Sequence, residues 1–316
     1  KSLLGPVINS QAMYEGGPNS GFSDIFPVGT PEQAAAAPCT GTGGLSATGC
    51  ASYEKYVKDN INRRPLVYLG ANDGMLHAFD AVTGSEVWAY VPHMLYGNGQ
   101  LDQLTNTAST LTTTVDDTPV TSDVFFPADS TDATKGGTWH TILVGSMRLG
   151  GRGIYALDIT DQSTPASETD AAGKFLWEFS SANDSDLGYT YASTNITRLQ
   201  NGRWVVLLTS GYFPQKLQVE SATYGKNATP DTASAASSGV THMWVLDAQT
   251  GAVIRKIDTP STVTSYGLST PNAIGTSPII AKIATAGDLA GNLWRFDLSD
   301  ADPTKWSVEV MFQTYD

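Results

Sequence analysis

The sequence has little charge and no long apolar run, and each shortage excludes a class of protein. Only 16% of its 316 residues are charged, and 18 Lys and Arg stand against 31 Asp and Glu, a formal net charge of -13. A negative field repels phosphate backbones and anionic lipids, so no nucleic-acid partner is expected. No apolar stretch reaches the length of a membrane-spanning helix. Residues 1–6 also lack the apolar core of a signal peptide, so no export signal is expected in the chain itself.

Motifs of the common enzyme classes are also absent. The sequence contains no HExxH, GxSxG, P-loop or CxxC motif, and Ser146 lacks the second glycine of a nucleophile elbow. The four histidines are scattered: His77, His93, His140 and His242. His77 and His242 fall on expected strands, where a packed or hydrogen-bonded imidazole is the ordinary situation. We therefore predict no catalytic residue, no cofactor site and no enzyme activity.

Cysteine is limited to Cys39 and Cys50, which lie in a loop-like tract rich in glycine and threonine. That tract is too short and flexible to bury either thiol, so a disulfide closing the loop is predicted. Two free thiols in a reducing compartment are the alternative. A metal site is disfavoured because no second Cys or His pair stands nearby. The disulfide, the acidic balance and the Ser/Thr-rich surface favour an exported protein.

What the sequence does contain is a repeated unit. Its clearest copy, residues 66–91, reads LVYLGANDGMLHAFDAVTGSEVWAYV. An apolar strand is followed by Asn72-Asp73-Gly74, a tight hairpin turn in which glycine takes positive φ. A second strand ends at Asp80, and Gly84 completes a second turn before a third strand. The unit is therefore a three-strand meander.

The same pattern recurs three more times, and each copy has a further strand before it. The later meanders lie in residues 139–179, 204–257 and 284–312. The preceding strands are expected at Val7–Tyr14, Pro119–Phe126, Asn195–Leu199 and Ala273–Ile283. Four strands per unit make one blade, with approximate blade limits 1–92, 118–181, 193–259 and 271–316.

Such a sheet has two apolar faces, which are hidden from water when sheets stack radially. The sequence thus predicts an all-β chain, a β-propeller of four-stranded antiparallel blades resembling quinoprotein propellers. About four blades are covered, and the family resemblance given below implies that they are part of a larger ring. A β-sandwich is the alternative, but it does not require the same turn chemistry to recur. The whole chain, 1–316, is then one partial propeller domain.

Three insertions interrupt the blades, at residues 16–62, 92–118 and 212–241. The first ends in a short helix on which Tyr53, Tyr56, Val57 and Ile61 share one face. Long loops on a rigid ring usually carry recognition. We expect the partner to contact these insertions.

Aspartates are the remaining candidate site residues. Four of them end strands at equivalent places in the repeat, and we interpret them as structural caps of the following turns: Asp80, Asp158, Asp247 and Asp297. Asp184 and Asp186 alternate with other oxygen-bearing side chains, but no bidentate carboxylate stands at the twelfth position of a calcium loop. They are weak calcium candidates, and a surface turn is the preferred interpretation.

The repeats resemble the C-terminal propeller of the PilY/PilC family of type IV pilus proteins. The resemblance rests on residues 67–80, on residues 143–145 with 150–158, on residues 186–189 and on residues 286–297. It implies a cell-surface protein of a Gram-negative bacterium, at a pilus tip or the outer membrane. The implied roles are pilus biogenesis, surface attachment and twitching motility. The implied partners are minor pilins or pilus tip subunits, and a host or abiotic surface.

One departure from that family concerns calcium. Family members often carry an Asp-rich calcium loop just before the motif Ala-Gly-Asp-Leu, which here is Ala286 to Leu289. The corresponding stretch, residues 273–285, contains no carboxylate. Without acidic oxygens it should not hold a hard dication tightly, so no metal ligand is carried over.

Two other functions remain open from the sequence. Asp-x-x-Thr-Gly followed by Trp also marks the blades of quinone-cofactor dehydrogenases, although the vicinal cysteines and the calcium site that such enzymes share are not visible here. An outer-membrane assembly scaffold could be built on a similar ring. Neighbouring genes or co-purifying pilins would separate these alternatives.

Overall fold

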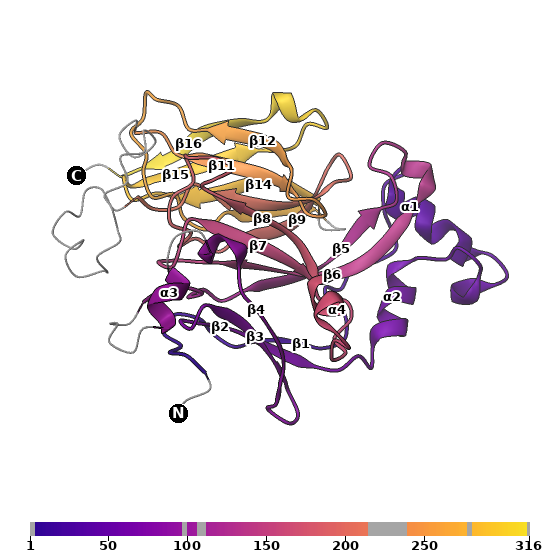
Figure 1. Cartoon of the computed structure of the whole chain (residues 1–316). Helices are drawn as coiled ribbons and strands as arrows, with labels where there is room; N and C mark the ends of the chain where they lie inside the picture. Colours follow the sequence, from indigo (N-terminus) through magenta and orange to yellow (C-terminus); the bar gives the residue numbers. More distant parts are fainter. Residues whose placement is uncertain (1–3, 97–99, 106–111, 214–238, 277–279, 315–316) are drawn as a thin grey trace.

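The computed structural model describes residues 4–96, 100–105, 112–213, 239–276 and 280–314. The chain is mostly β, and its sheets fan out one above another (Figure 1). The first sheet contains β1 (Met13–Glu15), β2 (Leu66–Ala71), β3 (Met75–Asp80) and β4 (Glu86–Tyr90). The second contains β5 (Val120–Pro127), β6 (Gly137–Ser146), β7 (Gly153–Asp158) and β8 (Phe175–Ser180).

The remaining strands continue this order. A third group contains β9 (Asn195–Leu199), β10 (Trp204–Thr209), β11 (His242–Asp247) and β12 (Val253–Asp258). A fourth contains β13 (Asn272–Thr276), β14 (Ile280–Gly287), β15 (Asn292–Asp297) and β16 (Ser307–Gln313). All pairings inside the four groups are antiparallel. The predicted all-β class with four-stranded antiparallel sheets is confirmed.

The third and fourth groups are joined, which the sequence did not predict. Residues Ile280 and Ala281 of β14 pair in parallel with Arg198 and Leu199 of β9. This edge of β14 is open to β9 at these two residues because the pairing of β14 with β15 begins only at Ile283. The join produces one eight-stranded, curled sheet. We call its two halves, β9–β12 and β13–β16, the third and fourth sheets.

Two expected strands are wrong in their limits. Within the expected strand at Val7–Tyr14, only Met13 and Tyr14 belong to a strand, because side-chain hydrogen bonds take the place of strand pairing before them. Ser10 Oγ accepts the Gly70 N–H at 3.0 Å, and Asn9 donates to a carboxylate of the second insertion. The expected strand at Ala273–Ile283 is instead divided between β13 and β14, which pair antiparallel with each other.

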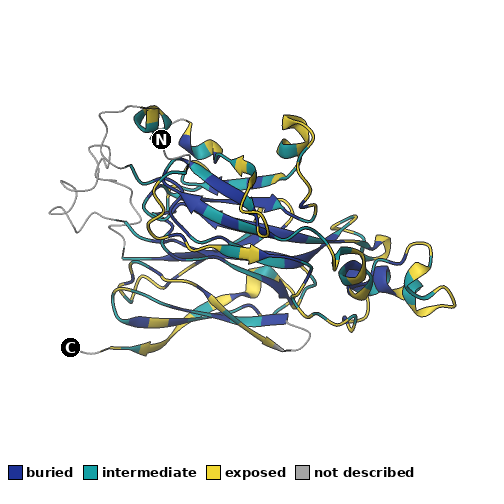
Figure 2. Ribbon diagram, turned by 90° about the horizontal axis from the view of Figure 1, so that it is seen from below, coloured by how far each residue is buried: buried dark blue, intermediate teal, exposed yellow. Residues whose placement is uncertain are grey.

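Buried clusters lie between successive sheets, so the two inner sheets bury both faces and the first and fourth bury one. Leu66 and Tyr68 of β2 pack with Leu143 of β6 in the cluster between the first two sheets. Alternate residues of β6 and β7 contribute to a second cluster with Trp204 and Trp244 of the third group. A third cluster joins the third and fourth groups. The buried strands form the interior band in Figure 2.

The turns have the expected backbone geometry. Gly74 and Gly84 have φ of 94° and 71°, which places both in the region that favours glycine. Short helices connect or flank the strands. They are α1 (Pro31–Ala36), α2 (Tyr53–Asn60), α3 (Gln100–Thr105) and α4 (Glu168–Ala172), with 3-10 turns η1 (Ala37–Thr40), η2 (Gly44–Ser46), η3 (His93–Leu95), η4 (Ala133–Lys135) and η6 (Pro303–Lys305).

The first insertion, residues 16–62, holds α1 and α2 and lies to one side of the sheets (Figure 1). Tyr53 and Tyr56 are buried in the cluster between the second and third sheets, as their predicted shared face requires. Ile61 does not belong to that face: it follows the last helical residue and is 56% exposed. Cys39 and Cys50 form a disulfide in this insertion. Most of the third insertion, 212–241, lies outside the described residues.

Candidate functional site

The four strand-ending aspartates all accept hydrogen bonds from the backbone of the turns that follow them. The N–H groups of Val82 and Thr83 donate to Asp80 at 2.9 and 2.7 Å. The N–H groups of Gln249 and Thr250 donate to Asp247 in the same way. Asp158 and Asp297 accept from Thr160 and Ser299. These four carboxylates come from four different blades, one from each four-stranded group, and each is engaged by its own turn.

The backbone N–H of Thr83 and the Arg64 guanidinium hold the pKa of Asp80 well below its usual range. Hydrogen bonds that the Ser299 hydroxyl and N–H donate to Asp297 likewise lower the pKa of that carboxyl. Both carboxylates therefore stay ionised at neutral pH. A general acid at pH 7 needs the opposite shift, so these residues are suited to holding turns.

Three histidines are each paired with carboxylates of their own sheet. His140 Nδ1 lies 2.7 Å from Asp158 Oδ2, and His242 Nδ1 lies 2.8 Å from Asp258 Oδ1. His77 has two partners, Glu86 Oε1 at 2.6 Å and Asp73 Oδ2 at 3.1 Å. The fourth, His93, stacks on a tyrosine in the second insertion. The structure does not bring the histidines together.

The His77 contacts predict a pH dependence of stability. Burial acts to lower the pKa of His77, but the hydrogen bonds and charges of Asp73 and Glu86 outweigh it and raise the pKa. A raised folded-state pKa stabilises the fold fully below the unfolded-state value, and that stability is lost as pH rises through the folded value. The free energy of unfolding of the wild type should therefore fall over the interval that begins at about pH 6.5, the usual pKa of histidine, and extends upward from it. His77→Gln should fall less over this interval in urea titrations; equal falls would contradict this origin.

The weak calcium candidates, Asp184 and Asp186, contact a cation supplied by the chain. The Lys256 ammonium lies 3.0 Å from Asp184 Oδ2 and also pairs with Asp186. Trp244 Nε1 donates to Asp184 Oδ2 at 2.9 Å, and the ammonium lies 5.1 Å from the centre of the Trp244 ring. Among the described residues, no group of three or more His, Cys, Asp or Glu side chains is placed to hold a metal ion.

A buried ion pair ties the first insertion to the third sheet, and sequence reasoning missed it. Arg198 Nε on β9 lies 2.6 Å from Glu32 Oε1 on α1, and the two side chains are only 1% and 0% exposed. Trp204 Nε1 donates to the same Glu32 oxygen at 2.9 Å. Thr30 starts α1 as its N-cap, which fixes Glu32 in the first turn. Helix α1 is thus held against the blade and does not project from it.

A second polar network fixes the insertion to the second sheet. Asp123 on β5 is 1% exposed and accepts hydrogen bonds from the Tyr53 and Thr141 hydroxyls, each at 2.7 Å. The Tyr56 hydroxyl contacts the Thr141 hydroxyl at 2.6 Å. Burial raises the pKa of Tyr56 to about 12. Both tyrosines therefore remain neutral hydrogen-bonding groups at physiological pH.

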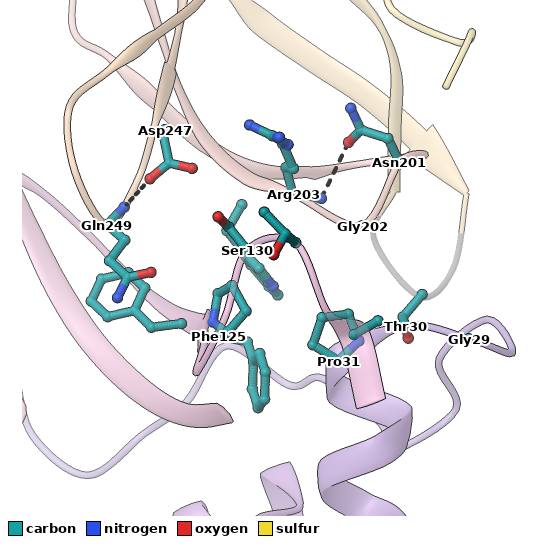
Figure 3. A pocket seen from close by; sticks show the side chains of 15 residues that line it. Gly29, Thr30, Pro31, Phe125, Ser130, Asn201, Gly202, Arg203, Asp247 and Gln249 are labelled. Atoms are coloured by element: carbon teal, nitrogen blue, oxygen red, sulfur yellow. Dashed lines mark hydrogen bonds between the residues drawn. The ribbon is translucent and has the colours of Figure 1, made fainter. Parts of the chain in front are cut away.

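A hollow of about 190 Å³ lies where this insertion meets the second and third sheets. Figure 3 shows Arg203, Asp247 and Gln249 around it, with Thr30 and Pro31 of the insertion on the other side. Its residues come from four segments that are distant in sequence, each a turn with the adjoining end of a strand or helix: 29–31, 125–133, 201–204 and 247–249. Of the residues chosen from the sequence, only Asp247 lines it.

Several known proteins are similar to this chain. A family model described as the PilY1 beta-propeller domain matches residues 43–315. The type IV pilus biogenesis factor PilY1 of Pseudomonas aeruginosa strain PAO1 is 37% identical over 252 residues, which cover 78% of this chain and 18% of that protein. A PilY1 homolog of Xylella fastidiosa is 31% identical over 313 residues, covering 98% of this chain and 20% of that protein.

A solved structure gives the same result for the fold. The crystal structure of the Pseudomonas aeruginosa PilY1 C-terminal domain matches with a TM-score of 0.58 and 30% identity, covering 84% of this chain and 49% of that one. The chain therefore spans about a fifth of the length of these curated relatives and about half of the solved domain. With its fanned four-stranded sheets and its match across residues 43–315, the chain belongs to the PilY1 beta-propeller domain family.

Proposed function

We propose that this chain is a non-enzymatic binding module of type IV pilus biogenesis. The observation that carries the proposal is the family match over residues 43–315, together with relatives named type IV pilus biogenesis factors. The module acts at the cell surface of a Gram-negative bacterium, at the pilus tip or the outer membrane. It supports pilus assembly, surface attachment and twitching motility.

The proposed partners are minor pilins or tip subunits, and a host or abiotic surface. Three features support binding and not catalysis. The strand-ending carboxylates are engaged by backbone donors, each histidine of the sheets has its own carboxylate, and the Asp184–Asp186 pair holds a lysine. None of the helices that the structure describes is long and apolar enough to cross a membrane.

An in-frame deletion of the region encoding residues 4–314 tests the proposal. We expect surface pili, attachment and twitching to be lost, because the partner loses its docking surface. The control is a Val82→Ser chain, which alters one exposed turn residue and should leave piliation intact. Normal pili, motility and attachment in the deletion strain would reject the proposal.

A further inference from the structure

We propose that the hollow between the first insertion and the third sheet binds one neutral sugar unit of a surface polysaccharide. The inference rests on the proposed attachment function and names the chemical class of its ligand. Pockets that bind small ligands combine apolar walls with a few fixed polar groups. This hollow is about 190 Å³ in volume, and polar and apolar groups line it in similar measure, Phe125 and Pro127 beside Arg203 and Gln249.

The hollow is built on rigid supports. Phe125 and Trp204 contribute to its lining and are only 1% and 5% exposed. The Trp204 indole is held by Glu32, which is itself fixed by Arg198. Thr30, at the start of the same helix, lines the opposite side. Because these supports are buried, the hollow is formed before any ligand arrives, which reduces the entropy lost on binding.

The polar side chains of the hollow have hydrogen-bonding groups that the described part of the chain does not use. Among the described residues, the Arg203 guanidinium has no hydrogen-bond or ion-pair partner; its engaged groups are the backbone N–H, which donates to Asn201, and the backbone C=O, which accepts from Leu199. The three bonds to Asp247 within the described chain all use Oδ1, which leaves Oδ2 as an acceptor. The exposed Gln249 amide can both donate and accept. A sugar hydroxyl also does both, so neighbouring hydroxyls match this mixture.

The charges favour a neutral ligand. Arg203 and Asp247 carry opposite charges on the same hollow. The nearby Lys135 is paired with Asp129, so it adds no free cation. The chain as a whole has a formal charge of -13, which repels anions. A carboxylated sugar should therefore bind less well than a neutral one.

The backbone disfavours an extended peptide as the occupant. Peptides commonly bind by adding a strand to an open sheet edge. Beside the hollow, β10 pairs with β9 and β11, and β11 also pairs with β12, so neither strand has an open edge. Among the described strands β5 pairs only with β6, but its end at the hollow is Pro127, which has no N–H to donate to an added strand. The hollow itself is lined mainly by turns. A compact ring therefore suits it better than a strand.

Saturation-transfer NMR on the purified chain tests the inference. The neutral probes are glucose, galactose, mannose and N-acetylglucosamine. N-acetylneuraminic acid is tested beside them as an anionic sugar, and Gly-Ser-Ala as a peptide. We expect at least one neutral sugar to bind the wild type. Arg203→Met and Gln249→Ala should each weaken it, Arg203→Met by roughly tenfold, since a charged donor contributes about this much.

The matched control is Arg295→Met, an arginine on β15 that pairs with Asp297 and Glu309 away from the hollow. It should bind like the wild type. Overturning results are no binding of any neutral sugar, stronger binding of the anionic sugar or the peptide, or equal weakening by all three variants. Piliation is scored separately: if the deletion strain loses pili while the wild-type chain binds no sugar, only this inference fails.

Discussion

Replacing Arg198 with methionine is expected to lower the free energy of unfolding by about 3–5 kcal/mol, the usual cost of breaking a buried ion pair. The change leaves Glu32 buried without its cation, 2.6 Å from where the guanidinium stood. The Trp204 indole N–H remains as a hydrogen-bond donor to Glu32, but it carries no charge. Urea denaturation followed by tryptophan fluorescence measures the effect.

A double variant, Arg198→Met with Glu32→Met, provides the control. Removing both charges leaves no uncompensated ion, so most of the lost stability should return. If the free energy of unfolding of the single variant fell by less than about 1 kcal/mol, the pair would contribute no more than an exposed salt bridge does. That outcome would contradict the anchoring of α1 described above.

Trp139→Ala is the second change with a large expected effect, a loss of about 3–5 kcal/mol of unfolding free energy. Trp139 on β6 is 5% exposed and packs against aromatic rings of the insertion, of its own sheet and of the third sheet. Ring centroids lie 4.8 Å away for Tyr53, 5.3 Å for Phe125 and 5.6 Å for Trp204. Truncation removes all these contacts and leaves a cavity where the insertion meets the sheets.

The control is Trp88→Ala on β4, where the tryptophan is only half-buried. It should cost roughly half as much, because less apolar area leaves water there on folding. Chemical denaturation of both variants gives the comparison. Equal losses would mean that Trp139 is not the centre of the packing between the insertion and the sheets.

The regular part of the fold was predictable because its signals are local. The Gly-containing hairpin and the Asp-started turn lie within single copies of the repeat, so Gly74 and Asp80 could be placed from neighbouring residues alone. The limits at Val7–Tyr14 and Ala273–Ile283 were wrong for a different reason. There the pairing depends on side chains and on a strand of another blade, Ser10 in one case and β9 in the other.

The candidate site was largely unpredictable because it is made by tertiary contacts. Glu32 and Arg198 are 166 positions apart, and neither stands in a motif. Asp123 sits on an ordinary-looking strand, and only the fold brings Tyr53 to it across 70 positions. The hollow combines turns from the insertion and two blades. The sequence predicted an insertion at residues 16–62, but the extent to which its helices are packed into the core appears only in the structure.

The central claim is that this propeller works by binding components of the pilus. Co-purification from cells assembling pili, with an affinity-tagged chain and mass spectrometry of the bound proteins, tests it most directly. The account predicts enrichment of minor pilins with the wild-type chain and their loss with Trp139→Ala, which loosens the insertion. Enrichment of outer-membrane assembly proteins without any pilin, in cells with normal pili, would contradict it.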